Sequence, residues 1–353
     1  MDEAAFRRLI SRQRTGATAA GLRVALGIAS LGYRTAIGFR NVMFDTGLRK
    51  IHRVAAPVIS IGNITTGGTG KTPIVALVCR MLQEFGVSPG IISRGYRSVD
   101  GLANDEKLVL ALQCPNVPHK QNPDRLVAAS DMLREHFVDV IVMDDGFQHR
   151  RLQRDFDLVL IDATNPFGCG HVLPRGLLRE PLSALRRADA VLMTRSDLVP
   201  EVELAAIQAA LLRTAPRLEG RILRAAFLPV GLFSVTGKRS DLSSIAGQSV
   251  FLMSGIGNPD AFAATCEQAG LQIAGTRWFA DHHQYTDSDL QAIQVAARQS
   301  RADRIVTTLK DLVKLGPTHE SILAIQIAPD FPIPTHFDTL RELLRSSVLR
   351  NSE

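Results

Sequence analysis

The order of apolar and polar residues divides the chain into three stretches, and the first is a single helical pattern at residues 17–44. At about 100° per residue, one narrow stripe of this predicted helix carries Arg23, Ser30, Arg34 and Asn41. The opposite side carries Ala25, Ile28, Ala36, Phe39 and Met43. Such a helix either docks on its own domain or lies in a membrane interface with its arginines facing lipid phosphates. Periodicity alone does not separate these alternatives.

From residue 57 onward, strand patterns alternate with helical patterns. Apolar runs rich in β-branched residues predict strands at 58–61, 90–92, 138–143, 156–161 and 190–193. Helical patterns fall between most of them, for example at 73–85 and 124–136. This alternation predicts an α/β fold with a mainly parallel sheet and helices on both of its faces.

A looser strand and helix pattern follows and predicts a second, smaller α/β domain. Its strands are expected at 222–227, 249–253, 272–278, 304–308 and 323–327, and its helices at 260–269 and 288–299. We place the boundary between residues 220 and 235. The expected parts are therefore an amphipathic N-terminal segment at 1–50, a larger domain at 51–225 and a smaller one at 226–353.

Composition narrows the class of partner. Of 353 residues, 45% are hydrophobic and 22% charged, which is usual for a globular protein. A net charge of +6 and a pI near 9.4 favour an anionic partner such as a nucleotide, a nucleic acid or an acidic membrane surface. The four cysteines are far apart, so a zinc site or a disulfide framework is not expected. We also expect no secretory signal and no spanning helix, because long uncharged apolar runs are missing.

The clearest chemical motif follows the first predicted strand and reads TTGGTGKT at residues 65–72. Its glycines allow backbone N–H groups to turn inward, and the following helix start adds partial positive charge, so the segment suits phosphate. A strict P-loop would have glycine where this chain has Thr65. We expect Lys71 to reach the β- and γ-phosphates of a nucleotide and Thr72 to face Mg²⁺. The expected ATP contacts are Thr65, Thr66, Gly67, Gly68, Thr69, Gly70, Lys71 and Thr72.

A pair of carboxylates, Asp144 and Asp145, ends the strand predicted at 138–143. Ligands of open α/β sheets bind at the carboxyl ends of the strands, so this pair is expected to face Lys71. There a carboxylate would hold Mg²⁺ in the Walker-B manner. The alternative is a solvated turn, because Asp-Asp-Gly is common turn chemistry.

Transfer of a phosphoryl group to a hydroxyl also requires a proton acceptor. Asp105 and Glu106 stand just before a predicted helix, where ordinary capping is the alternative. His282, His283 and Tyr285 lie in a predicted loop, and a His–Asp pair could form a base tuned to working pH. The sequence does not by itself pair Asp105 with a histidine so far along the chain.

Several blocks, taken together, resemble the tetraacyldisaccharide 4'-kinases of lipid A biosynthesis. They read SIGNITTGGTGKTP, SRGY, DDGFQHRRLQRDFD, LPRGLLREPL, SGIGNP and TTLKD, joined by Asp281-His282, and run in family order from about residue 55 to 315. The family loop also lacks the first P-loop glycine. The resemblance implies transfer of the ATP γ-phosphate to the 4'-hydroxyl of an acylated glucosamine disaccharide 1-phosphate, with Mg²⁺.

The resemblance also implies roles for individual residues. Asp105 matches the family's proposed base and His282 its partner. Lys71 and Thr72 match the phosphate and metal residues, Asp144 and Asp145 the Walker-B region, and Glu106, His149 and Glu180 further functional positions. The family's usual G-D-E-P motif is here Asn104-Asp105-Glu106-Lys107, which leaves the aim of Asp105 open.

The substrate of this family is a lipid of the inner leaflet. The resemblance therefore favours a peripheral enzyme on the cytoplasmic face of the inner membrane, with residues 17–44 in the interface. The positive net charge suits anionic lipids and a phosphorylated substrate. No obligate protein partner is evident.

Three other readings remain. A GTPase-type switch or metallochaperone is suggested by Thr194-Arg195-Ser196-Asp197, which loosely resembles a guanine-reading [NT]-K-x-D element, with Arg in place of Lys. Asp197 is otherwise a turn or capping residue. A nucleic-acid ATPase is disfavoured because only 5% of residues are aromatic and could stack on bases. A membrane-docked scaffold would bind ATP without forming a product.

Overall fold

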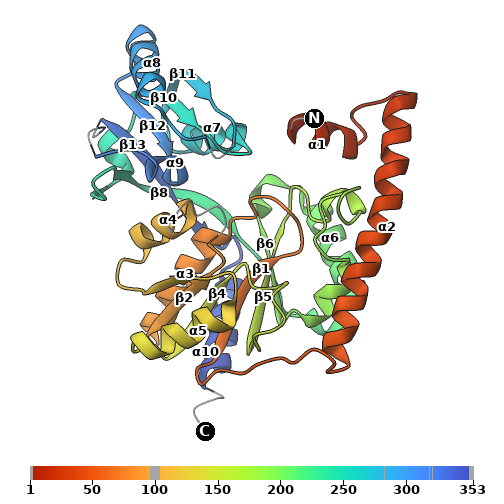
Figure 1. Cartoon of the computed structure of the whole chain (residues 1–353). Helices are drawn as coiled ribbons and strands as arrows, with labels where there is room; N and C mark the ends of the chain where they lie inside the picture. The colour runs from red at the N-terminus through yellow and green to blue at the C-terminus, as the bar shows by residue number, and fades with distance from the viewer. Residues whose placement is uncertain (1–2, 96–103, 282, 318, 320, 350–353) are drawn as a thin grey trace.

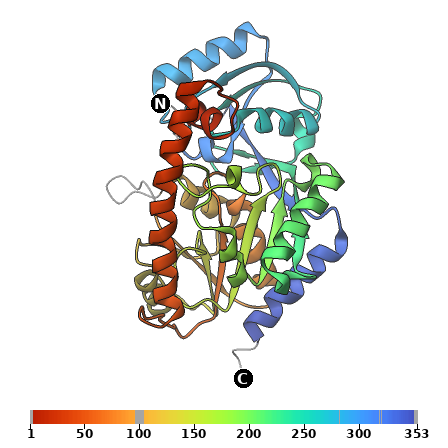
Figure 2. The same cartoon turned by 90° about the vertical axis from the view of Figure 1, so that its right-hand side faces the viewer.

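A computed structural model describes residues 3–95, 104–281, 283–317, 319 and 321–349 (Figure 1). They form two β-sheets, one of seven strands and one of six, with helices around both. A long helix near the N-terminus runs along one side of the molecule (Figure 2). Within the described ranges, no helix has both the length and the apolar character needed to cross a bilayer.

The seven-stranded sheet is parallel at every pairing, in the order β3-β2-β4-β1-β5-β6-β7. Its strands are β1 Val58–Asn63, β2 Pro89–Ser93, β3 His119–Gln121, β4 Val140–Asp144, β5 Phe156–Asp162, β6 Ala190–Thr194 and β7 Ile222–Arg224. The prediction of a mainly parallel sheet is confirmed. Because the strands are parallel, the carboxyl ends of β1, β4, β5 and β6 meet at one edge.

Helices cover both faces of this sheet, which is why its strands read as continuous apolar runs. Ile59 and Ile61 of β1 pack in one core with α3 Lys71–Glu84 and α10 Pro334–Leu349. Val58, on the other face, packs in a core with α5 Arg125–Glu135. A third core includes residues of α6 Glu201–Thr214.

The six-stranded sheet has the order β11-β10-β12-β13-β8-β9. Its strands are β8 Ala226–Ser234, β9 Arg239–Ser240, β10 Ser249–Ser254, β11 Gln272–Trp278, β12 Arg304–Thr308 and β13 Ile322–Asp330. β8 pairs antiparallel with β13 and β9, and the other pairings are parallel. Its helices are α7 Pro259–Gln268, α8 Asp287–Gln299 and α9 Leu309–Leu312.

The single strand predicted at 222–227 is wrong, because the chain changes sheets there. β7 belongs to the first sheet and β8 to the second, and Ala225 between them donates to Met193 and accepts from Ser196. The short polar strand β3 has no apolar pattern that could have predicted it.

The C-terminal helix α10 packs on the larger domain although it follows the second sheet in sequence. Leu340, Leu344 and Val348 are buried in the same core as Ile59 and Ile61. We therefore propose that the smaller domain predicted for 226–353 extends only to the loop before α10.

Helix α2 (Ala17–Asp45) follows the short helix α1 (Glu3–Ile10) and docks with its polar side inward. Ser30 is buried and donates to the carbonyl of Val172, and its hydroxyl accepts from Arg175 N–H. The outer side is apolar: Val24, Ile28, Leu31, Phe39 and Val42 are each 53–68% exposed. We call these five residues the outer stripe. The helix is thus attached to its domain by hydrogen bonds and turns its apolar residues outward.

Candidate functional site

The loop between β1 and α3 adopts the conformation of a phosphate cradle at the carboxyl edge of the first sheet. Gly67 and Gly70 have φ values of +118° and +80°, which favour glycine. A Cβ on Gly70 would also lie 2.3 Å from the ring of Phe227. Both glycines are therefore required by backbone geometry and close packing.

Thr65 replaces the first P-loop glycine without strain. It forms an antiparallel bridge with Leu178, and its φ is not positive. On either side, Thr66 N–H donates to Leu177 O (2.8 Å) and Arg179 N–H to Ile64 O (2.7 Å). Because the backbone at Thr65 is held extended against residues 177–179, no glycine is needed there.

The other side of the loop is held by the residues after β6. The Thr194 hydroxyl donates to Thr69 O and the Arg195 guanidinium to Gly68 O, both at 3.0 Å. Arg195 also pairs with Asp162 at the end of β5. In this structure the Thr194–Asp197 element therefore supports the phosphate loop, with its arginine engaged in that role.

Asp144 and Asp145 end β4 and differ in environment. Asp144 is buried, and its Oδ1 has no hydrogen-bond partner within the part of the chain that the structure describes. Asp145, with φ +53°, accepts two hydrogen bonds from Arg179 (2.7 and 3.0 Å). Its Oδ1 also lies 3.6 Å from the Lys71 amine, which is 3.5 Å from Asn63 Oδ1. The carboxylate pair therefore faces the phosphate loop, as predicted.

These surroundings separate the two carboxyl pKa values. Burial, reinforced by the negative charge of Glu106, raises the pKa of Asp144 to about 7. Burial also acts to raise the pKa of Asp145, but Lys71 and Arg179 outweigh it and hold that pKa at about 2. Asp145 is thus an anion at neutral pH, whereas the surroundings of Asp144 do not stabilise the ionised form of its carboxyl.

A hard cation would supply that stabilisation. A buried carboxylate oxygen without a partner is the oxygen chemistry that Mg²⁺ prefers, and the buried Thr72 at the start of α3 carries a further oxygen. Across the described ranges, no three His, Cys, Asp or Glu side chains form a closed metal cluster. The residues present therefore fit a cation that takes further ligands from phosphate oxygens and water.

Helix α4 (Asp105–Gln113) brings a second acidic pair to the same edge. Asn104 caps it by accepting from Lys107 N–H (3.0 Å), and Gln121 donates to the same Asn104 oxygen (2.8 Å). The start of α4 is therefore fixed by hydrogen bonds even though the sequence departs from G-D-E-P. Asp105 and Glu106 lie in the first turn of this helix. Glu106 is close enough to raise the pKa of Asp144.

The residues of the predicted base pair are only partly covered by the structure. Asp105 Oδ2 lies 3.6 Å from the Lys314 amine. His282 lies outside the described residues. The neighbouring His283 pairs with Asp289 at 3.0 Å and stacks on Phe279, so its ring is engaged within the smaller domain.

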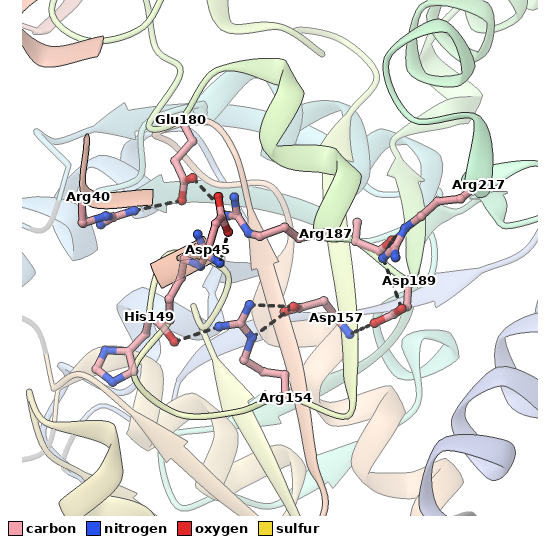
Figure 3. Close-up of polar contacts among 11 residues, drawn as sticks. Arg40, Asp45, His149, Arg154, Asp157, Glu180, Arg187, Asp189 and Arg217 are labelled. Atoms are coloured by element: carbon pink, nitrogen blue, oxygen red, sulfur yellow. Dashed lines mark hydrogen bonds and ion pairs between the residues drawn. The ribbon is translucent and has the colours of Figure 1, made fainter. Parts of the chain in front are cut away.

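Glu180 lies in a separate cluster under α2 (Figure 3). Its carboxylate is fully buried, with Oε1 accepting from Arg40 (3.3 Å) and Oε2 from Asn41 and Arg187 (both 3.0 Å). Tyr33 adds a hydrogen bond from α2 to Arg179 O (2.9 Å). The resemblance places Glu180 among functional positions, and here it attaches α2 to the domain.

His149 lies close to Arg154, which donates to its carbonyl oxygen and pairs with Asp157 (Figure 3). Burial, helped by the charge of Arg125, lowers the pKa of His149 to about 4. Its Nε2 is buried and has no hydrogen-bond partner in the described ranges. The imidazole is therefore neutral at neutral pH and has an unused ring nitrogen.

Comparison with known sequences decides the family. The family profile described as Tetraacyldisaccharide-1-P 4'-kinase matches residues 22–347. The chain belongs to this family. The resemblance noted in the sequence is thereby confirmed.

Family members that are named tetraacyldisaccharide 4'-kinase resemble the chain over most of its length. The protein from Syntrophus aciditrophicus is 38% identical over 325 residues, covering 84% of this chain and 86% of its own. That from Geobacter metallireducens is 35% identical over 340 residues, covering 89% and 96%. The crystal structure of LpxK from Aquifex aeolicus in complex with ATP superposes with a TM-score of 0.76 at 26% identity, covering 93% of this chain and 99% of that one.

Sequence reasoning missed three polar side chains that complete the site of this family member. Asn63 ends β1 and contacts both Lys71 and Arg179. Arg179 lies within the block LPRGLLREPL, but its motif gave no sign that it would reach Asp145 across the sheet edge. Lys314 follows TTLKD and comes from the smaller domain. Each depends on contacts that only folding creates.

Proposed function

We propose that the protein is an ATP-dependent kinase that transfers the γ-phosphate to the 4'-hydroxyl of tetraacyldisaccharide 1-phosphate in lipid A biosynthesis. The observation that supports this most directly is the convergence of Lys71, the Asp144–Asp145 pair and the acidic first turn of α4 at one edge of the sheet. Family members carrying this activity in their names span nearly the whole chain.

The loop, Lys71 and Mg²⁺ would bind the triphosphate. Its backbone N–H groups and the start of α3 attract phosphate oxygens. Lys71 is held loosely, 3.6 Å from Asp145 and 3.5 Å from Asn63, so its amine can turn to the β- and γ-phosphates. Phosphoryl transfer needs mainly positioning and charge neutralisation, and this arrangement provides both.

The proposed metal residues are Thr72, Asp144 and Asp145. When bound, Mg²⁺ neutralises phosphate charge at the reacting end of the nucleotide. Asp144 fits this role through its unpartnered buried oxygen. Asp145, which is already paired with Arg179, keeps that arginine directed at the same place.

Asp105 is the proposed base. Its carboxylate would accept the proton of the 4'-hydroxyl while that oxygen bonds to the γ-phosphorus and the bond to the β-phosphate oxygen breaks, leaving ADP. Glu106, beside it, lies toward Asp144. The pairing of Asp105 with His282 stays a prediction from the resemblance.

We propose that α2 lies in the membrane interface, with the outer stripe in contact with lipid acyl chains. Ser30, Tyr33 and Asn41 are already engaged in hydrogen bonds to the domain, so the outer stripe is the side that can meet another phase. Exposed basic residues near its end, Arg49 and Lys50, suit anionic headgroups. A lipid substrate places the enzyme on the cytoplasmic face of the inner membrane, as a peripheral protein.

The direct test is incubation of the purified protein with γ-labelled ATP and the disaccharide lipid. The expected product is the same lipid with a labelled phosphomonoester at the 4'-position. An excess of unlabelled ATP should abolish labelling, and the same excess of GTP should leave most of it. ATP hydrolysis without labelled lipid, or equal competition by GTP, would contradict the proposal and favour the GTPase or scaffold readings.

A further inference from the structure

Lys314 belongs to the smaller domain, yet its amine reaches the acidic helix start of the larger one. It follows α9, and its side chain is only 3% exposed. The amine lies 3.2 Å from Asp311 Oδ1 and 3.6 Å from Asp105 Oδ2. Burial of an ammonium group is unfavourable unless it is paired, so both carboxylates contribute to keeping it there.

Asp311 holds the lysine in a fixed place. This carboxylate is fully buried and accepts from Gly255 N–H (3.1 Å) and the Thr308 hydroxyl (2.8 Å). The Tyr285 ring, 6.0 Å from the Lys314 amine, covers another side of the cation. Because a lysine amine has three donors, the remaining direction is left for Asp105.

Helix α4, which carries Asp105, is itself shared between the two domains. Leu110 is buried in the core of the larger domain with residues of α3. The preceding residue, Val109, is buried in the core of the smaller domain with Leu309 and Leu312. The position of the first turn of α4 therefore depends on how both domains pack against it.

We propose that Lys314 is a positioning residue for Asp105, which makes the smaller domain part of the phosphotransfer site. This rests on the proposed role of Asp105 as base. The amine, which Asp311 holds in place, would keep the Asp105 carboxylate in one orientation.

The test compares Lys314→Met, Lys314→Arg and the control Lys238→Met over a range of pH. Lys238→Met removes the same charge from an exposed position in the smaller domain. For Lys314→Met we expect kcat to fall at least about tenfold at neutral pH and the KM for ATP to change less than about twofold.

Lys314→Arg, which keeps the cation, should restore most of the lost kcat at each pH tested, and Lys238→Met should leave kcat unchanged. An equal loss of kcat in Lys314→Met and Lys314→Arg, together with a lower unfolding temperature, would overturn the proposal and show that Lys314 is only structural. Wild-type kinetics in Lys314→Met would overturn it as well. If Lys314→Met does not fold, Lys314→Gln carries the same comparison, since an amide can still donate to Asp311.

Asp105→Asn separates this inference from the proposed function. If Asp105→Asn keeps wild-type kcat, the base assignment fails and Lys314 has nothing to position. If Asp105→Asn is inactive while Lys314→Met keeps wild-type kcat, only the role of Lys314 fails.

Discussion

Two buried carboxylates in this protein, Glu180 and Asp144, have opposite surroundings. Glu180 is fully buried and both of its oxygens are occupied, by Arg40, Asn41 and Arg187. Asp144 is buried almost as completely, yet its Oδ1 accepts no hydrogen bond in the described residues and its pKa is raised to about 7. The first carboxylate is saturated by the protein, whereas the second still lacks a partner.

This difference distinguishes a carboxylate that attaches a helix to its domain from a carboxylate that can still bind a ligand. Satisfied buried polar groups hold elements together, and an unsatisfied one requires an explanation such as a ligand. Glu180 joins α2 to the domain and has no capacity left for substrate. Asp144 has spare capacity at the edge where Lys71 and the phosphate loop lie. Resemblance had assigned Asp144 to the Walker-B region and Glu180 to the further functional positions, without showing this difference.

The largest effect is expected for Lys71→Ala, because Lys71 lies at the same sheet edge as the unsatisfied Asp144. Loss of the amine removes the cation directed at the β- and γ-phosphates, so turnover should fall by about 10³-fold or more. Phosphorylated lipid formed per minute measures this, with the unfolding temperature as the control for folding. Near-normal turnover would mean that the loop does not bind the nucleotide phosphates.

Asp144→Asn should reduce turnover by about 10²-fold or more without making the protein less stable than the wild type. The native pKa of Asp144, near 7, exceeds the ordinary 3.8, so between these pH values the native state binds more protons than the unfolded state. The contribution of Asp144 to the free energy of unfolding therefore falls as the pH rises through this range. Removing the charge should therefore raise the unfolding temperature at pH 8. Thermal unfolding at pH 5 and pH 8 measures this, and a marked destabilisation at pH 8 would mean that Asp144 is a structural residue.

Glu180→Gln should show the reverse pattern. Arg40 and Arg187 would lose their buried counter-charge, which typically costs about 3–5 kcal/mol in the free energy of unfolding. On detergent-dispersed substrate, the turnover of the folded fraction should fall less than about tenfold, because Glu180 does not contact the phosphate loop. Denaturant unfolding and kcat measure the two effects. Loss of activity without loss of stability would place Glu180 in the substrate site instead.

Replacing Ile28, Leu31 and Phe39 of the outer stripe by serine tests whether α2, the helix that Glu180 attaches to the domain, contacts lipid. These side chains are 64–68% exposed, so folding should be unchanged. Binding to vesicles that contain anionic lipid should weaken by about tenfold or more, as apolar contact with the acyl region is lost. Ala17→Ser, on the same helix, serves as the control. Unchanged vesicle binding would show that α2 does not face lipid.

The smallest effect is expected at His149, a third kind of buried polar group. Its native pKa of about 4 is below the ordinary 6.5, so the unfolded state binds more protons between these values. Stability should therefore be lost as pH falls from about 6.5 to 4. His149→Gln should flatten this part of the stability profile, measured by denaturant unfolding at several pH values. An unchanged slope would mean that His149 is not buried as a neutral ring.

The sequence by itself determined the local elements and the chemistry of the motif. Apolar runs specified the strands of the first sheet, because strands buried on both faces must be apolar along their length. Glycines, Lys71 and Thr72 in one short segment specified a phosphate loop, because that geometry is local to a strand end and a helix start. For the same reason Asp144 and Asp145 could be placed opposite the loop.

Only the tertiary structure decided which residues meet across the fold. Arg179 reaches Asp145, and Lys314 reaches Asp105 from another domain, through contacts between distant segments that leave no periodic pattern. The sequence likewise did not determine which side of α2 faces the protein, because its polar stripe could face either water or buried partners. Hydrogen bonds of Ser30 and Asn41 to the domain turn that side inward, and this leaves the outer stripe exposed.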